Sequence, residues 1–310
     1  MHFKEITLKD KEEIDSIFSQ VELRDCDRSF AAAWLWKDHY KVDYTVLHGM
    51  LVFRSRLNGT SFSFPVGEGN KKEALCELRQ YCEEEGIPFR LHSLSREDEE
   101  YLNKEYPGMY EIKFSRDDAD YVYLAEKLRT LSGKKYHGKR NHINKFKENH
   151  EWSYEKIDDT NRQECLDMLE EWKKQNCDTE DMEKHEEICV SRNALVHMEE
   201  LGLTGGAIRA EGIIIAFSIG ERICEDTFVV HIEKAFANIQ GAYPLINQQF
   251  VIHEAGDCMY INREDDCGEE GLRKAKLSYH PVMLVEKGYA CLAAEQQRCM
   301  KMNEDMQVGA

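Results

Sequence analysis

The stretch Asn262–Pro281 reads NREDDCGEEGLRKAKLSYHP and has the most distinctive pattern in the sequence. A predicted strand ends in an acidic cluster, two glycines form a loop, and a helix follows that Pro281 stops. Acidic and basic groups thus meet across one loop, where carboxylates can hold an ammonium group and cations a phosphate or carboxylate. An internal salt-bridge network that locks the loop is the alternative. The residues that we assign to substrate binding are Asn262, Arg263, Asp265, Asp266, Arg273 and Lys276, with Asp265 and Asp266 facing an amine and Arg273 and Lys276 facing an anion.

A second pattern is the basic segment Lys127–Lys147, in which eight Lys or Arg and two His occur without any Asp or Glu. We expect a helix over Ala125–Asn149 that breaks at Ser132-Gly133. Concentrated cations favour phosphate contacts with a nucleotide, a lipid headgroup or tRNA. A solvated helix face that pairs with acidic residues elsewhere is the alternative. The residues of this segment that we assign to a phosphate or polyanion are Lys135, Lys139, Arg140 and Lys147.

A third pattern runs from Val229 to Tyr243. Strand alternation places His231 and Glu233 on one face, where one can act as a base and the other as its orienting partner. The turn at Gln240 and Gly241 opens a helix and offers backbone N–H groups to an anion. Tyr279 is a candidate proton donor. The alternatives are a buried histidine paired with a carboxylate for structure alone, and a tyrosine that only packs.

The order of the predicted elements indicates an α/β fold with mixed sheets. The chain has the same order of elements twice: helices, then an antiparallel meander, then alternating strands and helices. This is the element order of a GNAT-type acyltransferase. A predicted strand over Met109–Phe114 closes the first copy. We therefore expect an N-terminal domain over residues 1–120, a C-terminal domain over 121–295 that carries the main motifs, and a tail over 296–310.

Composition narrows the class of protein. The chain has 310 residues, 41 Lys or Arg against 59 Asp or Glu, and a formal net charge of −18. The beginning of the chain lacks a signal-peptide core, and the longest apolar stretch, Ile213–Ile219, is far too short to span a bilayer. We expect a cytoplasmic protein without membrane insertion. The 11 cysteines include no CxxC pair, and His185 with Cys189 form an isolated pair, so we expect neither a disulfide framework nor a metal site.

The sequence resembles the phosphatidylglycerol lysyltransferase C-terminal-like family of bacteria. Three stretches carry this resemblance: the quoted loop, KKYHGKRNHINKF and HIEKAFANIQGAYPLIN. The similarity extends over roughly residues 20–290 and is greatest to small stand-alone cytosolic members. It implies two tandem GNAT-like domains and transfer of an aminoacyl group from aminoacyl-tRNA to a lipid headgroup. The chain departs from the lysyl-lipid enzymes in having no membrane segments. It departs from acetyltransferases because Ala237–Ala242 keeps only a fragment of the usual pyrophosphate loop.

Three functional hypotheses follow. The first is an acyltransferase that moves an activated acyl group, with aminoacyl-tRNA as the expected donor, to an amine or hydroxyl of a small-molecule acceptor. The second is an acetyl-CoA-dependent N-acetyltransferase of a small amine. The third is a GNAT-like binding module without catalysis. The sequence leaves the donor, the acceptor and the oligomeric state open.

Overall fold

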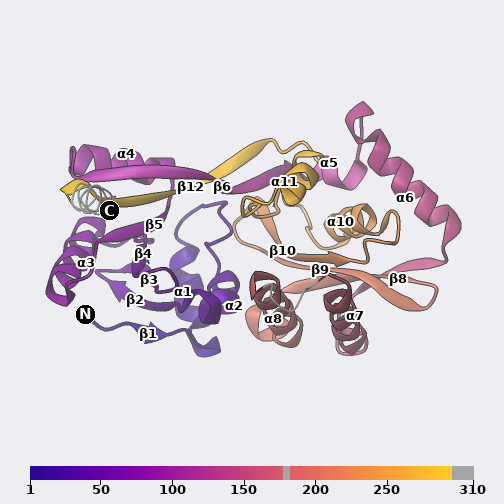
Figure 1. Ribbon diagram of the computed structural model, residues 1–310, viewed down its shortest axis with the longest axis horizontal. Helices are drawn as coiled ribbons and strands as arrows, with labels where there is room; N and C mark the ends of the chain where they lie inside the picture. Colours follow the sequence, from indigo (N-terminus) through magenta and orange to yellow (C-terminus); the bar gives the residue numbers. More distant parts are fainter. Residues whose placement is uncertain (177–181, 295–310) are drawn as a thin grey trace, which may run out of the picture. The chain divides into compact units, whose positions relative to one another are not determined.

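The computed structural model describes residues 1–176 and 182–294 (Figure 1). The chain forms two compact units that are interleaved in sequence. The first contains Met1–Val21, Trp36–Ala119 and the segment from Val285 onward, and the second contains Glu22–Leu35 and Asp120–Leu284. The division into two domains at residue 120 stays a prediction, and the expected tail lies outside the described residues.

The first unit is built on a mixed sheet with the strand order β1-β2-β3-β4-β5-β12-β6. Strands β4 and β5 run parallel, whereas β1 with β2, β2 with β3, β3 with β4 and β5 with β12 run antiparallel. Both β6 and β12 also contribute residues to the second unit, and so does α2, whose residues up to Leu35 belong there. The elements are β1 (Lys4–Glu5), η1 (Leu8–Asp10), α1 (Lys11–Phe18), α2 (Phe30–Tyr40), β2 (Asp43–Leu47), β3 (Met50–Ser55), β4 (Ser61–Ser63), α3 (Lys71–Glu85), β5 (Arg90–Leu94), α4 (Arg96–Glu105), β6 (Tyr110–Leu124) and β12 (Met283–Leu292).

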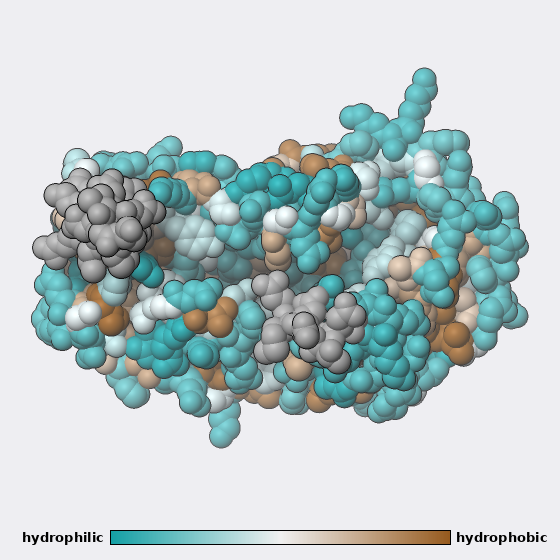
Figure 2. All heavy atoms as spheres, viewed as in Figure 1, coloured by the Kyte–Doolittle hydropathy of each residue, from teal (hydrophilic) through white to brown (hydrophobic). Residues whose placement is uncertain are grey.

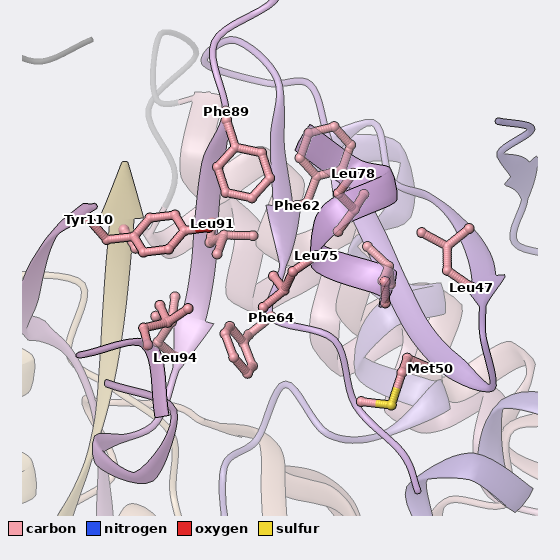
Figure 3. Packing of buried hydrophobic residues seen from close by; sticks show 14 of the residues in the cluster. Leu47, Met50, Phe62, Phe64, Leu75, Leu78, Phe89, Leu91, Leu94 and Tyr110 are labelled. Carbon is pink, nitrogen blue, oxygen red and sulfur yellow. The ribbon is translucent and has the colours of Figure 1, made fainter. Parts of the chain in front are cut away.

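Helix α3 supplies much of the core of this unit (Figure 3). It begins after Asn70, whose side chain accepts a hydrogen bond from Glu73 N, and ends at Gly86, which has a φ of 66°. Its apolar residues recur every three or four positions and so form one buried face. They pack against side chains of the sheet in a cluster that includes Leu47, Met50, Phe62, Phe64, Leu75, Leu78, Phe89, Leu91, Leu94 and Tyr110.

The second unit carries the three sequence motifs on a sheet with the order β6-β11-β10-β9-β8-β7. Strands β10 and β11 run parallel, and the other pairs run antiparallel. Its further elements are α5 (Ala125–Thr130), η2 (Lys134–Tyr136), α6 (His137–Asn149), β7 (Trp152–Lys156), α7 (Arg162–Asn176), α8 (Met182–Val196), α9 (Met198–Leu201), β8 (Thr204–Ala210), β9 (Ile213–Arg222), β10 (Thr227–Ala235), α10 (Ala242–His253), β11 (Tyr260–Asn262) and α11 (Glu270–Leu277).

Helices cover both faces of this second sheet, with α10 on one face and α7 and α8 on the other (Figure 1). Phe228 of β10 packs against Phe250 of α10 with ring centroids 5.7 Å apart. On the opposite face, the indole N–H of Trp172 in α7 donates to the carbonyl oxygen of Ala235 at 3.1 Å. The mixed α/β architecture expected from the sequence is confirmed.

Most predicted elements have bounds close to those expected, and the predicted helix break is confirmed because α5 ends at Thr130 and α6 begins at His137. Strand β4 was not predicted. The predicted strand end at Phe114 is wrong, since β6 continues to Leu124. The charged run Arg116–Asp118 suggested a loop, but its side chains remain at least partly exposed, so they continue the strand without losing their hydration. In the described ranges, none of the helices has the length and apolar character that crossing a bilayer requires.

Helix α6 packs closely against the beginning of α10. Gly241, which precedes α10, has a φ of 97°, in the region that favours glycine. A Cβ atom at this position would lie 2.6 Å from the carbonyl oxygen of His142 and 3.0 Å from Cβ of Phe146. Both its conformation and the approach of α6 therefore require a glycine here.

We expect Gly241→Ala to lower the free energy of unfolding by about 1 to 3 kcal/mol, because it adds backbone strain and a steric clash. The matched control is Gly138→Ala within α6, where a Cβ meets nothing within 4 Å. This control should raise stability by about 1 kcal/mol through helix propensity. Urea unfolding of both variants is the measurement, and a Gly241→Ala protein as stable as the wild type would contradict the packing described.

Candidate functional site

A polar cluster (Glu233, Asn247, Arg263 and Tyr279) lies largely buried beside α10. Arg263 Nη2 donates to Glu233 Oε1 at 2.8 Å, and Asn247 Nδ2 donates to Glu233 Oε2 at 3.0 Å. The Arg263 guanidinium lies 4.8 Å from the centroid of the Tyr279 ring. The side chains of Glu233 and Arg263 are each 12% exposed. Burial removes much of the hydration of both charges, so each charge must be stabilised by the other.

Three buried polar atoms at this site have no hydrogen-bond partner within the described part of the chain: Arg263 Nη1, Asn247 Oδ1 and Ser218 Oγ. Ser218 lies directly opposite Glu233 in the antiparallel pair of β9 and β10. Buried polar groups are nearly always hydrogen-bonded, and the exceptions call for water, an ion or a functional role. The polar cluster therefore offers an unused donor and unused acceptors to a polar group of a ligand.

The basic segment adjoins this cluster. Lys134, Lys135, Lys145 and Lys147 are exposed, and the surface over α6 is strongly hydrophilic in Figure 2. Among the described residues, none of the eight Lys and Arg of the segment forms an ion pair with a carboxylate. Arg129 donates to the carbonyl oxygen of Gly256 at 2.5 Å, and Arg140 donates to the carbonyl oxygens of Leu131 and Gly133. These two arginines hold loops. Lys147 Nζ lies 4.7 Å from the centroid of the Trp152 ring, and burial lowers the pKa of Lys147.

Lys139 differs from the other residues of the segment because it turns inward. Its Nζ lies 3.4 Å from the centroid of the Tyr279 ring and donates to Ser278 Oγ at 2.8 Å. Burial lowers the pKa of Lys139 to about 8, as does the positive charge of Arg263, while Glu233 opposes the change. The structure thus places a residue assigned to polyanion binding next to the polar cluster.

Tyr279 is itself buried, and burial raises the pKa of its phenol. Its carbonyl oxygen accepts a hydrogen bond from Tyr136 Oη at 2.9 Å, and its ring meets that of Tyr123 edge-on. A phenol that stays protonated suits the predicted role of proton donor. The same contacts suit the packing alternative, so the role of Tyr279 stays a prediction.

His231 does not pair with Glu233. The register of β10 against β9 shifts between Val230 and Ile232, so His231 lies at a bulge. Its ring nitrogens lie 3.0 Å from a carboxylate oxygen of Glu221 and 2.8 Å from one of Glu264. Burial alone would lower the pKa of His231, but the hydrogen bonds to the two carboxylates raise it to about 10. At neutral pH the imidazole already carries its proton, which counts against its predicted role as a base.

The loop Asn262–Gly271 is held by a network of its own. Asn262 Nδ2 donates to the carbonyl oxygen of Arg24 at 2.7 Å and to Asp120 Oδ2 at 2.8 Å. Glu264 and Cys267 have positive φ angles of 56° and 48°. Non-glycine residues adopt this conformation at a cost, which the surrounding contacts must compensate.

The charged side chains of the loop and of α11 are engaged within the protein. Asp266 is fully buried and accepts hydrogen bonds from Arg273 Nε at 2.9 Å and Nη2 at 2.6 Å. These hydrogen bonds, against the effect of burial, hold the pKa of Asp266 at about 2. Lys276 Nζ donates to the carbonyl oxygens of Arg263 and Asp265, and burial lowers the pKa of Lys276. The geometry matches the salt-bridge alternative, and binding roles for these residues stay predictions.

The turn at Gln240 and Gly241 lies under α6. The Gln240 side chain accepts from Lys145 Nζ at 3.1 Å and contacts His142 Nδ1 at 3.0 Å. Beside it is a groove of about 280 Å³ lined by residues of α6 and of the turn: Lys145, Phe146, Asn149, His150, Asn238, Ile239 and Gln240. The Gln240 side chain and the Gly241 backbone therefore lie against α6, which covers this side of the turn.

The described residues bring together one set of metal-ligand types, namely Asp25, Cys26 and Asp120, all buried. Asp120 Oδ2 already accepts hydrogen bonds from Cys26 N at 2.8 Å and from Asn262. The geometry therefore fits a loop anchor, in which the carboxylate satisfies backbone and amide donors.

The sequence reasoning missed Ser218, Asn247 and the inward direction of Lys139. Asn247 belongs to a polar run, Asn247 to Gln249, between buried Ile246 and buried Phe250, so the sequence did not distinguish it from its neighbours. Nothing in the sequence distinguished Lys139 either, because it lies among seven other basic residues of the same segment.

The His231 contacts generate a prediction about stability and pH. The pKa of His231 is raised in the folded chain above its usual 6.5, so between pH 6.5 and 10 the folded state binds more protons than the unfolded state. This stabilisation is complete below pH 6.5 and is lost as the pH rises toward 10. We expect the free energy of unfolding to fall from this source by about 1.4 kcal/mol per pH unit.

Urea unfolding between pH 6.5 and 9.5 measures this slope. His231→Gln should lack it, whereas His2→Gln, at an exposed position, should keep it. Equal slopes for His231→Gln and the wild type would contradict the raised pKa.

Arg273 generates a second prediction. Its removal leaves the buried Asp266 carboxylate without its cation, which costs about 3 to 5 kcal/mol in a fully buried pair. Since the Arg273 side chain is 30% exposed, we expect Arg273→Ala to lower the free energy of unfolding by about 2 kcal/mol. Lys274→Ala, one residue along and exposed, is the control and should change it by less than about 0.5 kcal/mol. If both variants are equally stable in urea, the anion-contact hypothesis for Arg273 gains over the structural one.

Comparison with known proteins agrees with the sequence resemblance. Residues 18–292 match the family described as phosphatidylglycerol lysyltransferase, C-terminal. The crystal structure of a conserved protein of unknown function from Bacteroides thetaiotaomicron is 39% identical, with a TM-score of 0.89, and the match covers 94% of this chain and 99% of that one. The uncharacterized protein MYCGA3080 of Mycoplasmoides gallisepticum is 28% identical over 190 residues, which is 57% of this chain and 58% of that protein.

Two more distant structures share the fold. The C-terminal domain of a putative lysylphosphatidylglycerol synthetase from Agrobacterium fabrum has a TM-score of 0.62 at 12% identity and covers 96% of both chains. FemX has a TM-score of 0.58 at 9% identity, over 97% of this chain and 99% of that one. The fold expected from the family resemblance is confirmed. The chain belongs to the phosphatidylglycerol lysyltransferase C-terminal family.

Proposed function

We propose that this protein transfers an aminoacyl group from aminoacyl-tRNA to an amine or hydroxyl of a small-molecule acceptor. The main support for this proposal is the basic segment. Its cations form no ion pairs with carboxylates of the described residues, although the chain has a net charge of −18. In an acidic protein, exposed lysines would ordinarily find carboxylate neighbours. A row of cations without carboxylate partners favours a polyanionic ligand whose phosphates release counterions on binding.

The polar cluster supports the acyl-transfer part of the proposal. In the reaction, the acyl carbon forms a bond to the acceptor nitrogen or oxygen and loses its bond to the ribose oxygen of the donor. One proton moves from the acceptor to that leaving oxygen. The unpartnered Nη1 of Arg263 suits an acyl oxygen on which negative charge develops, because a preorganised buried donor stabilises such an oxygen.

The packing of α6 counts against coenzyme A as the donor. A pyrophosphate needs several open N–H groups at a helix N-terminus. Here the carbonyl oxygen of His142 lies against Gly241, and its partial negative charge would repel a phosphate. The family match supports an aminoacyl group as the cargo, since its description names a lysyltransferase.

Binding of unfractionated bacterial tRNA and of coenzyme A, each titrated against salt, tests the donor. We expect tRNA to bind more tightly than coenzyme A at low ionic strength, with an affinity that falls steeply with salt. Lys135→Gln should weaken tRNA binding and reduce the salt slope by about 1. Lys72→Gln, with the same change of charge on an exposed position of α3, should leave both unchanged. Tight, weakly salt-dependent binding of coenzyme A without binding of tRNA would overturn the proposal in favour of acetyl transfer.

A further inference from the structure

Lys139 has an environment unlike that of a phosphate-binding lysine. It is half-buried, its Nζ lies over the Tyr279 ring at 3.4 Å, and it donates to Ser278 Oγ. Lys135, four residues earlier, is exposed. A lysine that only attracts phosphates gains nothing from burial, because burial disfavours its charged form. The position of Lys139 therefore calls for another explanation.

Charged and titratable groups face Lys139 from three neighbouring elements. Arg263, after β11, adds a like charge; Glu233, on β10, adds an opposite charge; and Tyr279, after α11, presents its ring. Since Glu233 is already paired with Arg263, it neutralises Lys139 only in part. Burial and the like charge together lower the pKa of Lys139 to about 8. About a tenth of this amine is therefore unprotonated at pH 7 and about half at pH 8, as a proton acceptor requires.

The other candidates for a base are less suited. His231 is held as an imidazolium between Glu221 and Glu264. Both carboxylate oxygens of Glu233 are engaged, one by Arg263 and one by Asn247. Tyr279 keeps its proton because burial raises its pKa. Among these groups, the amine of Lys139 alone is free to gain and lose a proton without breaking a buried ion pair.

We propose that Lys139 accepts the proton of the acceptor's nucleophilic group and returns it to the leaving oxygen of the donor. The inference rests on the proposed acyl transfer and assigns its proton-transfer step. As the bond from the acceptor to the acyl carbon forms, the acceptor proton moves to Lys139 Nζ. As the bond from the acyl carbon to the donor oxygen breaks, the same proton moves to that oxygen. The amine ends as it began, and no co-reactant is needed.

The first test measures the protonation of Lys139 without any substrate. The full-length protein is trace-labelled with acetic anhydride from pH 6 to 11, and the extent of labelling at each lysine is read by mass spectrometry. Lys139 should label with a midpoint near pH 8, about two units below the ordinary lysine value of about 10.4. A midpoint for Lys139 at that ordinary value would overturn the inference, whatever the substrate is.

The second test uses bacterial tRNA charged with a mixture of radiolabelled amino acids, with a small-molecule extract of bacterial cells as the source of the acceptor, and measures binding and protein-dependent loss of the ester label. Lys139→Arg keeps the positive charge but cannot accept a proton. We expect it to bind charged tRNA within about twofold of the wild type and to release the label at least about 100-fold more slowly at pH 8. The wild-type rate should rise through pH 8. Lys274→Arg is the control and should match the wild type.

The outcomes separate the inference from the proposed function. If the wild type binds and discharges the tRNA and Lys139→Arg does so equally fast, the role of Lys139 is wrong and the proposed function stands. If the wild type neither binds nor discharges it, the proposed function fails, and the proton-transfer step falls with it even where Lys139 labels near pH 8. If Lys139→Arg loses binding together with turnover, Lys139 is a phosphate contact and the inference is overturned.

Discussion

The buried ion pair between Glu233 and Arg263 is the constraint on which the second unit depends. Its partners come from β10 and from the residue after β11, and Asn247 of α10 holds the remaining carboxylate oxygen. Removing either charge would leave the other buried without compensation, so three elements must keep one relative placement. Directly after Arg263, Glu264 has a positive φ, and its carboxylate lies 2.8 Å from His231 Nδ1.

The loop that follows is stabilised by charges that face inward. Asp266 and Arg273 form one pair, and Lys276 donates to two carbonyl oxygens on the near side of the loop. This arrangement explains how a loop with two strained non-glycine residues stays in one conformation. The loop thereby holds the backbone of Arg263, whose Nη1 has no hydrogen-bond partner among the described residues.

Periodicity and capping residues predicted most helices and strands, because those signals are local. The site was less predictable for reasons visible in particular residues. The alternation of β10 predicted that His231 and Glu233 act together as base and orienting partner. A bulge at His231, between Val230 and Ile232, which spacing does not encode, gives the two side chains different contacts. The pattern of Asn262–Pro281 revealed opposite charges across one loop, yet spacing alone cannot say whether Asp266 meets Arg273 or a ligand. The family resemblance supplied the tandem fold, and only the tertiary structure distinguished Lys139 from its basic neighbours.

The two sides of helix α6 have different environments, one exposed to solvent and one packed against the protein. On its exposed side, lysines without carboxylate partners provide positive potential on an acidic protein. On its inner side, Lys139 reaches the Tyr279 ring, and the backbone at His142 closes against Gly241. Helix α6 thus lies against Gly241 and presents one amine, that of Lys139, to the buried cluster. Phosphate attraction and proton transfer are assigned to different residues of the same helix, because a lysine cannot be both fully solvated for the first and desolvated for the second.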